Sequence, residues 1–257
     1  MRIRVKLLAP RPPVRLPLNY NHHLTSLIYW LLERSSRDYA TFLHDEGYRS
    51  GSKRFKLFTF SQLHFKRFKL DPPAIVSLER EIEWQISSPI MEFVEHLAQG
   101  LLSQGEVQIA GVRLQIERIE TLPQPEFSER MKFICLSPLV VSRSVERGGK
   151  RMAHYWHYDE PGLSEAVQAN LCKKYALIHG EPFPSSDLNF VFDEAYIQSK
   201  DGQVYKLIDF KGTKIKGILA PFAVEGSPEL IEVGYEAGFG EKNSMGFGMV
   251  ASIRSGG

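Results

Sequence analysis

Residues 238–248, near the end of the chain, read Gly-Phe-Gly-Glu-Lys-Asn-Ser-Met-Gly-Phe-Gly. Since glycine places no side chain between the backbone and a ligand, the backbone amides of such a turn and the adjacent Lys242 can approach a phosphate chain closely. The spacing fits neither the dinucleotide fingerprint nor the P-loop, because Asn243 and Met245 stand where these motifs require glycine. A tight turn without a ligand is the alternative interpretation. The candidate phosphate-contacting residues here are Gly238, Gly240, Lys242, Asn243, Ser244, Gly246 and Gly248.

The segment 49–70 is a second candidate site, because it is rich in lysine and arginine and contains no acidic residue. Residues 1–70 hold 14 Lys or Arg against 4 Asp or Glu, although the net charge of the whole chain is only +2. Phenylalanines alternate with the basic side chains, a mixture that can neutralise phosphates while aromatic faces stack on unpaired bases. The alternative is a strand with one aromatic core face and one solvated basic face. The candidate nucleic-acid contacts are Arg49, Lys53, Arg54, Lys66, Arg67 and Lys69, and a second basic stretch adds Lys211, Lys214 and Lys216.

The first half of the chain must position the basic segment, and its apolar spacing predicts two helices among several strands. Leu24, Leu27, Ile28 and Leu31 recur at helical spacing, whereas residues 2–8 alternate apolar and basic side chains as a half-buried strand does. The expected elements are a strand at 2–8, a helix at 21–34, a short helical turn at 39–44, strands at 55–65 and 75–87, a helix at 89–102, and a hairpin at 106–119 that turns at Ala110–Gly111.

The second half repeats this succession after a proline-containing linker at 121–126. The expected elements are strands at 131–136, 188–199, 203–210 and 245–253, with helices at 162–179 and 228–237. The strands at 188–199 and 203–210 are expected to form a hairpin that turns at Asp201–Gly202. A split β-α-β arrangement that occurs twice predicts an α+β protein of two tandem ferredoxin-like (RRM-like) domains, each a four-stranded antiparallel sheet with two helices. We place these domains at residues 1–122 and 127–257.

Composition excludes several classes of protein. With 43% hydrophobic and 24% charged residues, the chain has an ordinary globular composition and is not expected to be disordered. Its apolar runs fall far short of the roughly 18 residues that cross a bilayer, and Cys135 and Cys172 are too few for a disulfide framework. A cytoplasmic protein with no membrane contact, metal or cofactor is the expectation.

Residues 233–250, which contain the glycine-rich segment, closely resemble the C-terminal signature of the CRISPR-associated repeat-cleaving endoribonucleases of the RAMP superfamily. The N-terminal half is similar to that family at Leu27-Ile28-Tyr29, at Thr41-Phe42-Leu43-His44 and at residues 56–61. The resemblance implies two ferredoxin-like domains and metal-independent cleavage of repeat RNA in precursor transcripts. The expected products are guide RNAs with a 5′-hydroxyl and a 2′,3′-cyclic phosphate.

In that family a tyrosine, a histidine and a lysine carry the chemistry, and the matching positions here are Tyr29, His44 and Lys56. Attack of the 2′-hydroxyl on the neighbouring phosphorus needs a base, an acid for the departing 5′-oxygen, and positive charge beside the phosphorane. Tyr29 lies about 140° around the helix from the apolar stripe, and an imidazole titrates near neutrality, at about 6.5. A packing tyrosine, a capping histidine and a solvated lysine are the alternative interpretations, and Lys53 or Arg54 could take the place of Lys56.

Two rival functions remain open at this stage. A non-catalytic RAMP subunit that holds guide RNA in an interference complex would keep the glycine-rich loop but not need His44. A nucleotide-using enzyme on the same scaffold is disfavoured by the absent P-loop signature. The expected partners are CRISPR repeat RNA, other CRISPR-associated interference proteins and, as an open alternative, a second copy of the chain.

Overall fold

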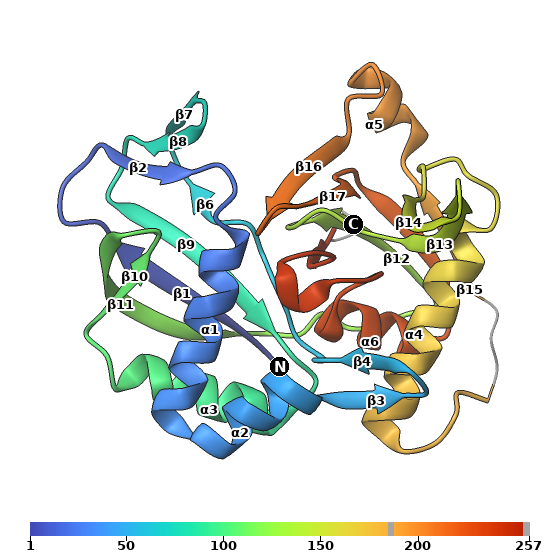
Figure 1. Cartoon of the computed structure of the whole chain (residues 1–257), viewed down its shortest axis with the longest axis horizontal. Helices are drawn as coiled ribbons and strands as arrows, with labels where there is room; N and C mark the ends of the chain where they lie inside the picture. The colour runs from blue at the N-terminus through green and yellow to red at the C-terminus, as the bar shows by residue number, and fades with distance from the viewer. Residues whose placement is uncertain (185–187, 254–257) are drawn as a thin grey trace. The chain divides into compact units, whose positions relative to one another are not determined.

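The computed structural model of the chain describes residues 1–184 and 188–253. They form two units, shown in Figure 1. The first unit holds Met1–Gln124 together with Ser244–Gly246, and the second holds Pro125–Asn243 and the chain from Phe247 onward.

The first unit is built on a six-stranded antiparallel sheet whose path runs β10-β11-β1-β9-β5, with β6 also paired to β9. The order β11-β1-β9-β5 is the fourth-first-third-second order of a ferredoxin-like sheet, and β10 extends it at one edge. Its strands are β1 (Arg2–Leu8), β5 (Thr59–Phe60), β6 (His64–Phe65), β9 (Glu81–Ser87), β10 (Glu106–Ile109) and β11 (Val112–Leu122). A smaller three-stranded sheet has the order β2 (Val14–Pro17), β8 (Ala74–Ser77) and β7 (Phe68–Asp71). A two-stranded hairpin joins β3 (Tyr48–Ser50) to β4 (Lys53–Phe55).

Two helices, α1 (Asn21–Ser35) and α3 (Met91–Leu102), pack against each other in this unit. The predicted stripe of α1 is buried as expected in a core that also contains Phe58 and Trp84. The two backbones approach closely at Gly100, where a Cβ would lie 2.2 Å from the carbonyl oxygen of Leu31. A short helix, α2 (Arg37–Thr41), continues into one π-helical turn, η1 (Phe42–Glu46).

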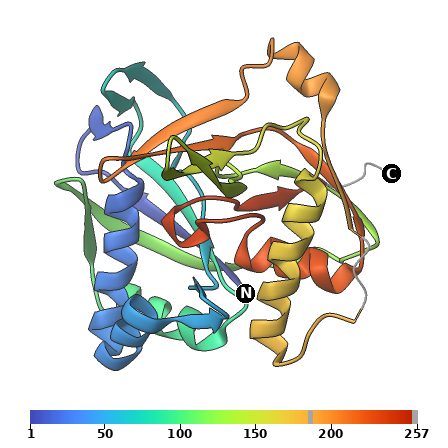
Figure 2. The ribbon, with the colours of Figure 1, turned by 45° about the vertical axis from the view of Figure 1, so that its right-hand side comes forward.

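The second unit contains a four-stranded antiparallel sheet in the order β15-β18-β12-β19, the second-third-first-fourth order of the same fold. Its long helices α4 (Leu163–His179) and α6 (Pro228–Ala237) contact each other (Figure 2). The strands are β12 (Arg130–Cys135), β15 (Leu188–Phe192), β18 (Phe222–Gly226) and β19 (Val250–Ser252). The helix α6 begins where Ser227 accepts a hydrogen bond from the amide of Glu229 and Pro228 occupies the first turn.

Both units therefore have the predicted ferredoxin-like order, but the details differ from the sequence-based expectation. The first sheet has six strands instead of four, and the strands predicted at 55–65 and 75–87 are broken into shorter pieces. The strand predicted at 188–199 ends at Phe192, because Asp193 caps a short helix, α5 (Glu194–Ser199), by accepting from the amide of Tyr196. The last predicted strand starts later, after a 3₁₀ turn at Asn243–Met245.

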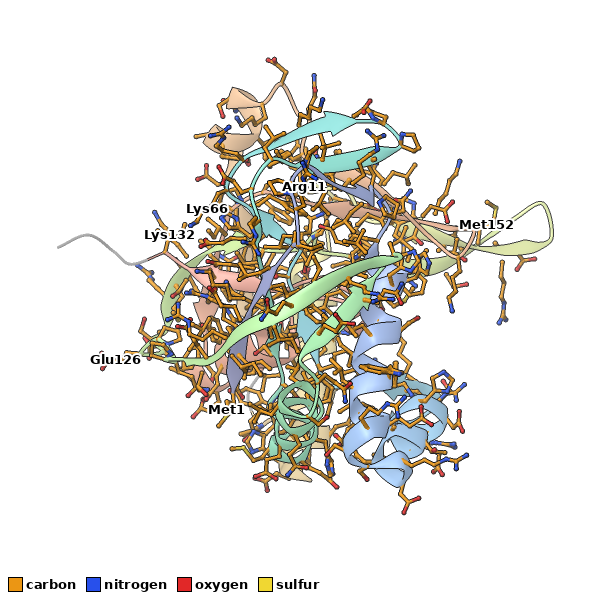
Figure 3. The ribbon with its side chains drawn as sticks, turned by 90° about the vertical axis from the view of Figure 1, so that its left-hand side faces the viewer. Met1, Arg11, Lys66, Glu126, Lys132 and Met152 are labelled. Carbon is orange, nitrogen blue, oxygen red and sulfur yellow. The ribbon has the colours of Figure 1, made fainter. Side chains whose placement is uncertain are left out.

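Two hairpins of the second unit lie outside its main sheet. One joins β13 (Ser142–Arg147) to β14 (Lys150–Tyr155), where the exposed side chain of Met152 is labelled in Figure 3, and this hairpin was not predicted. The other joins β16 (Tyr205–Phe210) to β17 (Thr213–Ile218). The strand predicted at 203–210 thus pairs with β17 and not with β15. No helix in the described residues is both long enough and apolar enough to traverse a membrane.

Candidate active site and RNA-contacting surfaces

Tyr29 and His44 lie side by side in the first unit. Their ring centroids are 5.2 Å apart in an edge-to-face arrangement, although Tyr29 comes from α1 and His44 from η1. The imidazole is exposed, and its Nδ1 lies 2.7 Å from Oδ1 of Asp45. Burial raises the pKa of the half-buried Tyr29 phenol, so the phenol keeps its proton at neutral pH. The pair therefore combines a protonated hydroxyl with an accessible imidazole.

Lys56 joins this pair through the backbone of η1. Its ammonium donates to the carbonyl oxygen of His44 at 2.7 Å and to that of Leu43. Burial and the charge of Arg54 lower the pKa of Lys56, whereas Asp45 opposes this effect. An ammonium has three N–H donors, and the described residues supply these two acceptors, so the third N–H can serve a substrate oxygen.

Gly47 is a residue of this site whose role the sequence did not reveal. Its φ of +60° favours glycine, and a Cβ at this position would lie 2.7 Å from the carbonyl oxygen of Phe55. The same Cβ would lie 3.0 Å from Cδ and 3.1 Å from Nζ of Lys56. A larger residue at position 47 would therefore displace Lys56. A glycine that closely follows a predicted helical turn is the sequence signal that could have been sought.

The alternative cations for the catalytic role occupy the β3–β4 hairpin. Arg54 donates to the carbonyl of Asp45 at 2.6 Å, so it lies against η1 but contacts a carbonyl other than the two that Lys56 contacts. Arg49 pairs with Arg54 across the hairpin, and both are exposed, as is Lys53. The hairpin thus presents basic side chains beside the turn that carries His44.

The remaining basic candidates are distributed over several elements. Lys66, labelled in Figure 3, forms an ion pair with Glu81, and Arg67 lies 3.5 Å from Glu79, so both cations already face a carboxylate. The exposed Lys69 is on β7. In the second unit the exposed Lys211 and Lys214 lie on the β16–β17 hairpin, and Lys216 stacks its ammonium 4.0 Å from the ring centroid of Tyr205.

Three of the five phenylalanines in the basic segment are core residues and cannot stack on bases. Phe58, Phe60 and Phe65 are 0%, 0% and 5% exposed, whereas Phe55 is half-buried and Phe68 is exposed. These three rings form the aromatic core face that the alternative interpretation expects, whereas contact of the exposed basic side chains with RNA stays a prediction. The rings pack on different neighbours: Phe58 stacks on Phe93 of α3 with ring centroids 4.6 Å apart, Phe60 lies edge to face with Trp84 of β9, and Phe65 lies against Phe68 of β7.

The glycine-rich segment is a tightly folded loop whose glycines are required by internal packing. A Cβ at Gly240 would lie 2.3 Å from the carbonyl oxygen of Val140, and one at Gly248 would lie 2.0 Å from that of Phe239. The buried amide of Asn243 donates to the carbonyls of Phe239 and Phe247. Gly238 is buried too, whereas Lys242 is half-buried. Glycine here serves the folding of the loop itself.

Lys174 on α4 holds this loop together, and no motif in the sequence pointed to that role. The residue is 2% exposed, and its ammonium donates to the carbonyls of Gly238 and Gly240 at 2.6 and 2.8 Å and to Oδ1 of Asn243 at 2.8 Å. Burial lowers the pKa of Lys174 to about 7, while the carboxylate of Glu241 opposes this effect. One buried cation therefore gathers three acceptors of the loop.

The tip of the loop belongs to the first unit. Asn21 donates from Nδ2 to the carbonyls of Met245 and Gly246 at 3.0 and 3.3 Å, and Thr25 donates to the carbonyl of Ser244 at 3.1 Å. A Cβ at Gly246 would lie 2.4 Å from the ring of Phe60. The N-terminal end of α1 thus fixes this tip. Among the described residues no group of three or more His, Cys, Asp or Glu side chains is placed to hold a metal ion.

Two ferredoxin-like units with a glycine-rich loop before the last strand define a protein of the RAMP type. A solved structure described as a RAMP protein binding different RNA substrates superposes with a TM-score of 0.84 at 25% identity, over 99% of this chain and 100% of the other. The chain belongs to the Cas6 family of CRISPR-associated proteins: residues 15–120 match the Cas6 N-terminal model and residues 122–252 the Cas6 C-terminal model.

Two relatives are named as endoribonucleases. The CRISPR-associated endoribonuclease Cas6 1 of Methanocaldococcus jannaschii is 30% identical over 253 residues, which cover 98% of this chain and 93% of the relative. The CRISPR-associated endoribonuclease Cas6 of Pyrococcus furiosus is 31% identical over 92% of this chain and 83% of the relative. The family expected from the signature residues is thereby confirmed.

Proposed function

We propose that this chain is a metal-independent endoribonuclease that cleaves CRISPR repeat RNA in precursor transcripts. The observation that carries the proposal is the convergence of Tyr29 from α1, His44 from η1 and Lys56 from the segment between β4 and β5. Family membership supports the substrate class, because relatives over nearly the whole chain are named CRISPR-associated endoribonucleases.

In the proposed reaction the 2′-hydroxyl loses its proton to the imidazole of His44, and the 2′-oxygen forms a bond to phosphorus. The bond from phosphorus to the 5′-oxygen then breaks, and the imidazolium returns the proton to that oxygen. The products are a 2′,3′-cyclic phosphate and a 5′-hydroxyl. An exposed imidazole is suited to this exchange because RNA can reach it.

Tyr29 and Lys56 stabilise the charge that develops on the phosphorane. The raised pKa of Tyr29 keeps the phenol protonated, which makes it a hydrogen-bond donor to a phosphate oxygen. Lys56 contributes positive charge through the N–H that the carbonyls of Leu43 and His44 leave available. Arg49, Lys53 and Arg54 on the adjacent hairpin bind the RNA backbone next to the scissile phosphate.

The test is incubation of the purified protein with repeat RNA in EDTA, followed by mapping of the cut and its end groups. We expect cleavage that a 2′-deoxy nucleotide immediately upstream of the cut abolishes. His44→Ala should lower the cleavage rate by about 100-fold or more with RNA affinity nearly unchanged, whereas His64→Ala, at an exposed histidine on β6, should have little effect. Intact RNA with tight binding would refute the nuclease and favour the binding-only subunit.

A further inference from the structure

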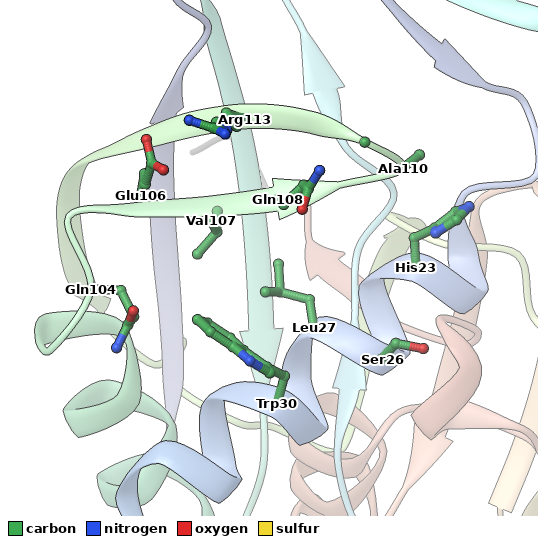
Figure 4. Close-up of a pocket in the computed structure, with 11 residues that line it drawn as sticks. His23, Ser26, Leu27, Trp30, Gln104, Glu106, Val107, Gln108, Ala110 and Arg113 are labelled. Atoms are coloured by element: carbon green, nitrogen blue, oxygen red, sulfur yellow. The ribbon is translucent and has the colours of Figure 1, made fainter.

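A pocket of about 610 Å³ lies in the first unit beside α1, the helix that carries Tyr29 (Figure 4). It is bounded by α1 on one side and by the β10–β11 hairpin on the other. This volume falls within the roughly 300 to 1,000 Å³ of small-ligand sites. Its apolar side chains are Leu27, Trp30 and Val107, and its polar ones come from His23, Ser26, Gln104, Glu106, Gln108 and Arg113.

The hairpin exposes backbone hydrogen-bonding groups at the outer edge of the sheet. Ile109 and Val112 flank the two-residue turn and form a hydrogen-bonded pair, so Gln108 and Arg113 form the next, non-hydrogen-bonded pair. Consequently the N–H and C=O of Gln108 point away from β11. Within the part of the chain that the structure describes, β10 is the last strand on this side of the sheet. Gln108 thus offers a backbone donor and a backbone acceptor at this edge.

Trp30 supplies an aromatic ring next to these groups. The ring is half-buried, and the guanidinium carbon of Arg34 lies 5.0 Å from its centroid. Arg113, exposed on β11, adds a second positive charge at the rim. An aromatic face, a hydrogen-bonding edge and nearby cations are the three elements that recognise an unpaired nucleotide: base stacking, base-edge bonding and phosphate attraction.

The pocket also lies close to the site of cleavage along the same helix. Trp30 follows Tyr29 in the chain, so the two side chains leave α1 about 100° apart, and Ser26 lies between them. A strand of RNA that passes the Tyr29–His44 pair can therefore continue around α1 into the pocket.

We propose that this pocket holds one unpaired nucleotide of the RNA, with its base stacked on Trp30 and its edge bonded to Gln108. This inference rests on the proposed function, since it adds a subsite for the same RNA. The edge of β10 suits this occupant better than an added peptide strand, because β10 has only four residues and carries Glu106 and Gln108 on its exposed face.

The first experiment measures binding of single-stranded oligo(A) and oligo(U) and of repeat RNA made non-cleavable by a 2′-deoxy substitution at the cut. Trp30→Ala should weaken binding of at least one of these RNAs by about tenfold or more, as expected when one base loses its stacking partner. Trp30→Phe should retain most of the affinity because it keeps a ring. Leu102→Ala, at a residue of α3 that is 75% exposed, controls for the loss of surface apolar area and should leave affinity unchanged.

The second experiment separates the backbone edge from the side chain. Gln108→Ala removes only the amide group, whereas Gln108→Pro also removes the outward N–H without breaking the β10–β11 ladder. We expect Gln108→Pro to bind RNA more weakly than Gln108→Ala, with unchanged circular dichroism for both variants.

These binding measurements are independent of cleavage, so a failed nuclease test leaves the subsite open. Conversely, equal RNA affinity of folded Trp30→Ala and of the parent would overturn the subsite even if the parent cleaves repeat RNA. Such a result would leave the edge of β10 to a protein partner.

Discussion

Replacement of Lys174 by methionine removes the buried ammonium while it preserves the length of the side chain. Burial lowers the pKa of Lys174 from 10.5 to about 7, a difference that corresponds to about 5 kcal/mol of free energy against the charged form. Against this, the substitution leaves three buried acceptors without a donor, at about 1–3 kcal/mol each. The two effects are similar in size and opposite in sign, so we expect the free energy of unfolding near pH 7 to change by only a few kcal/mol.

The pH dependence of stability is the sharper signature of Lys174. Between pH 7 and 10.5 the unfolded chain keeps the proton of this lysine while the folded chain releases it, so the free energy of unfolding should rise with pH. The expected slope from this one group is about 1.4 kcal/mol per pH unit. Below pH 7 both states are protonated, and the slope from Lys174 vanishes.

Urea unfolding across this pH range measures the effect as a difference between the parent and Lys174→Met. The variant should lack the rise, whereas Lys173→Met, at the exposed neighbouring lysine, should keep it. RNA affinity should fall for Lys174→Met alone, because the loop loses the cation that gathers its carbonyls. Parallel pH profiles for the parent and Lys174→Met would refute the reasoning, since they would mean that the buried group does not change its protonation in this range.

Three further predictions concern the candidate active site and its hairpin. Gly47→Ala should cost about 1–3 kcal/mol in stability and slow cleavage, because the new Cβ meets the carbonyl of Phe55 and the side chain of Lys56; a parent-like rate would show that Lys56 tolerates displacement. Because the pKa of Lys56 is lowered, the cleavage rate of the parent should fall at an alkaline pH below the titration range of an ordinary lysine. Lys56→Met should cleave slowly and should lack this fall in a pH–rate profile; a fall of the same shape in both proteins would exclude Lys56 as its cause. Arg49→Ala should weaken RNA binding and lower the slope of log affinity against log salt concentration by about one. Lys66→Ala should have a smaller effect, because Lys66 is already paired with a carboxylate, and equal effects in a salt titration would contradict this order.

The parts of the fold that follow from local pattern could be predicted from the sequence. The apolar stripe of α1 and the two-residue turn at Ala110–Gly111 depend on residues close together in the chain, and both occur as expected. The repeated order of strands and helices gave the ferredoxin-like arrangement for the same reason. By contrast, α5 interrupts an alternating pattern at a single capping residue, Asp193, and so short a helix has too few turns to show periodicity.

The environment of individual side chains in the site could not be predicted in this way. Phe58 and Phe60 share a segment with Lys56, and only the packed core decides that the rings are buried while the ammonium reaches a carbonyl of η1. Lys174 lies in a run of ordinary helical residues, and its acceptors come from residues 238–243, far along the chain. Contacts between distant residues set these roles, and a pattern of neighbours carries no information about them.

The loop tip Ser244–Gly246 has a consequence for synthesis. It is part of the first unit, although it follows residues 125–243 of the second unit in the sequence. Asn21 and Thr25 donate to carbonyl groups of this tip. During synthesis the first unit can therefore be completed only after residues 125–243 of the second unit have been translated. A transcript cut short before codon 244 would yield a chain in which the amide of Asn21 and the hydroxyl of Thr25, at the start of α1, have lost these acceptors.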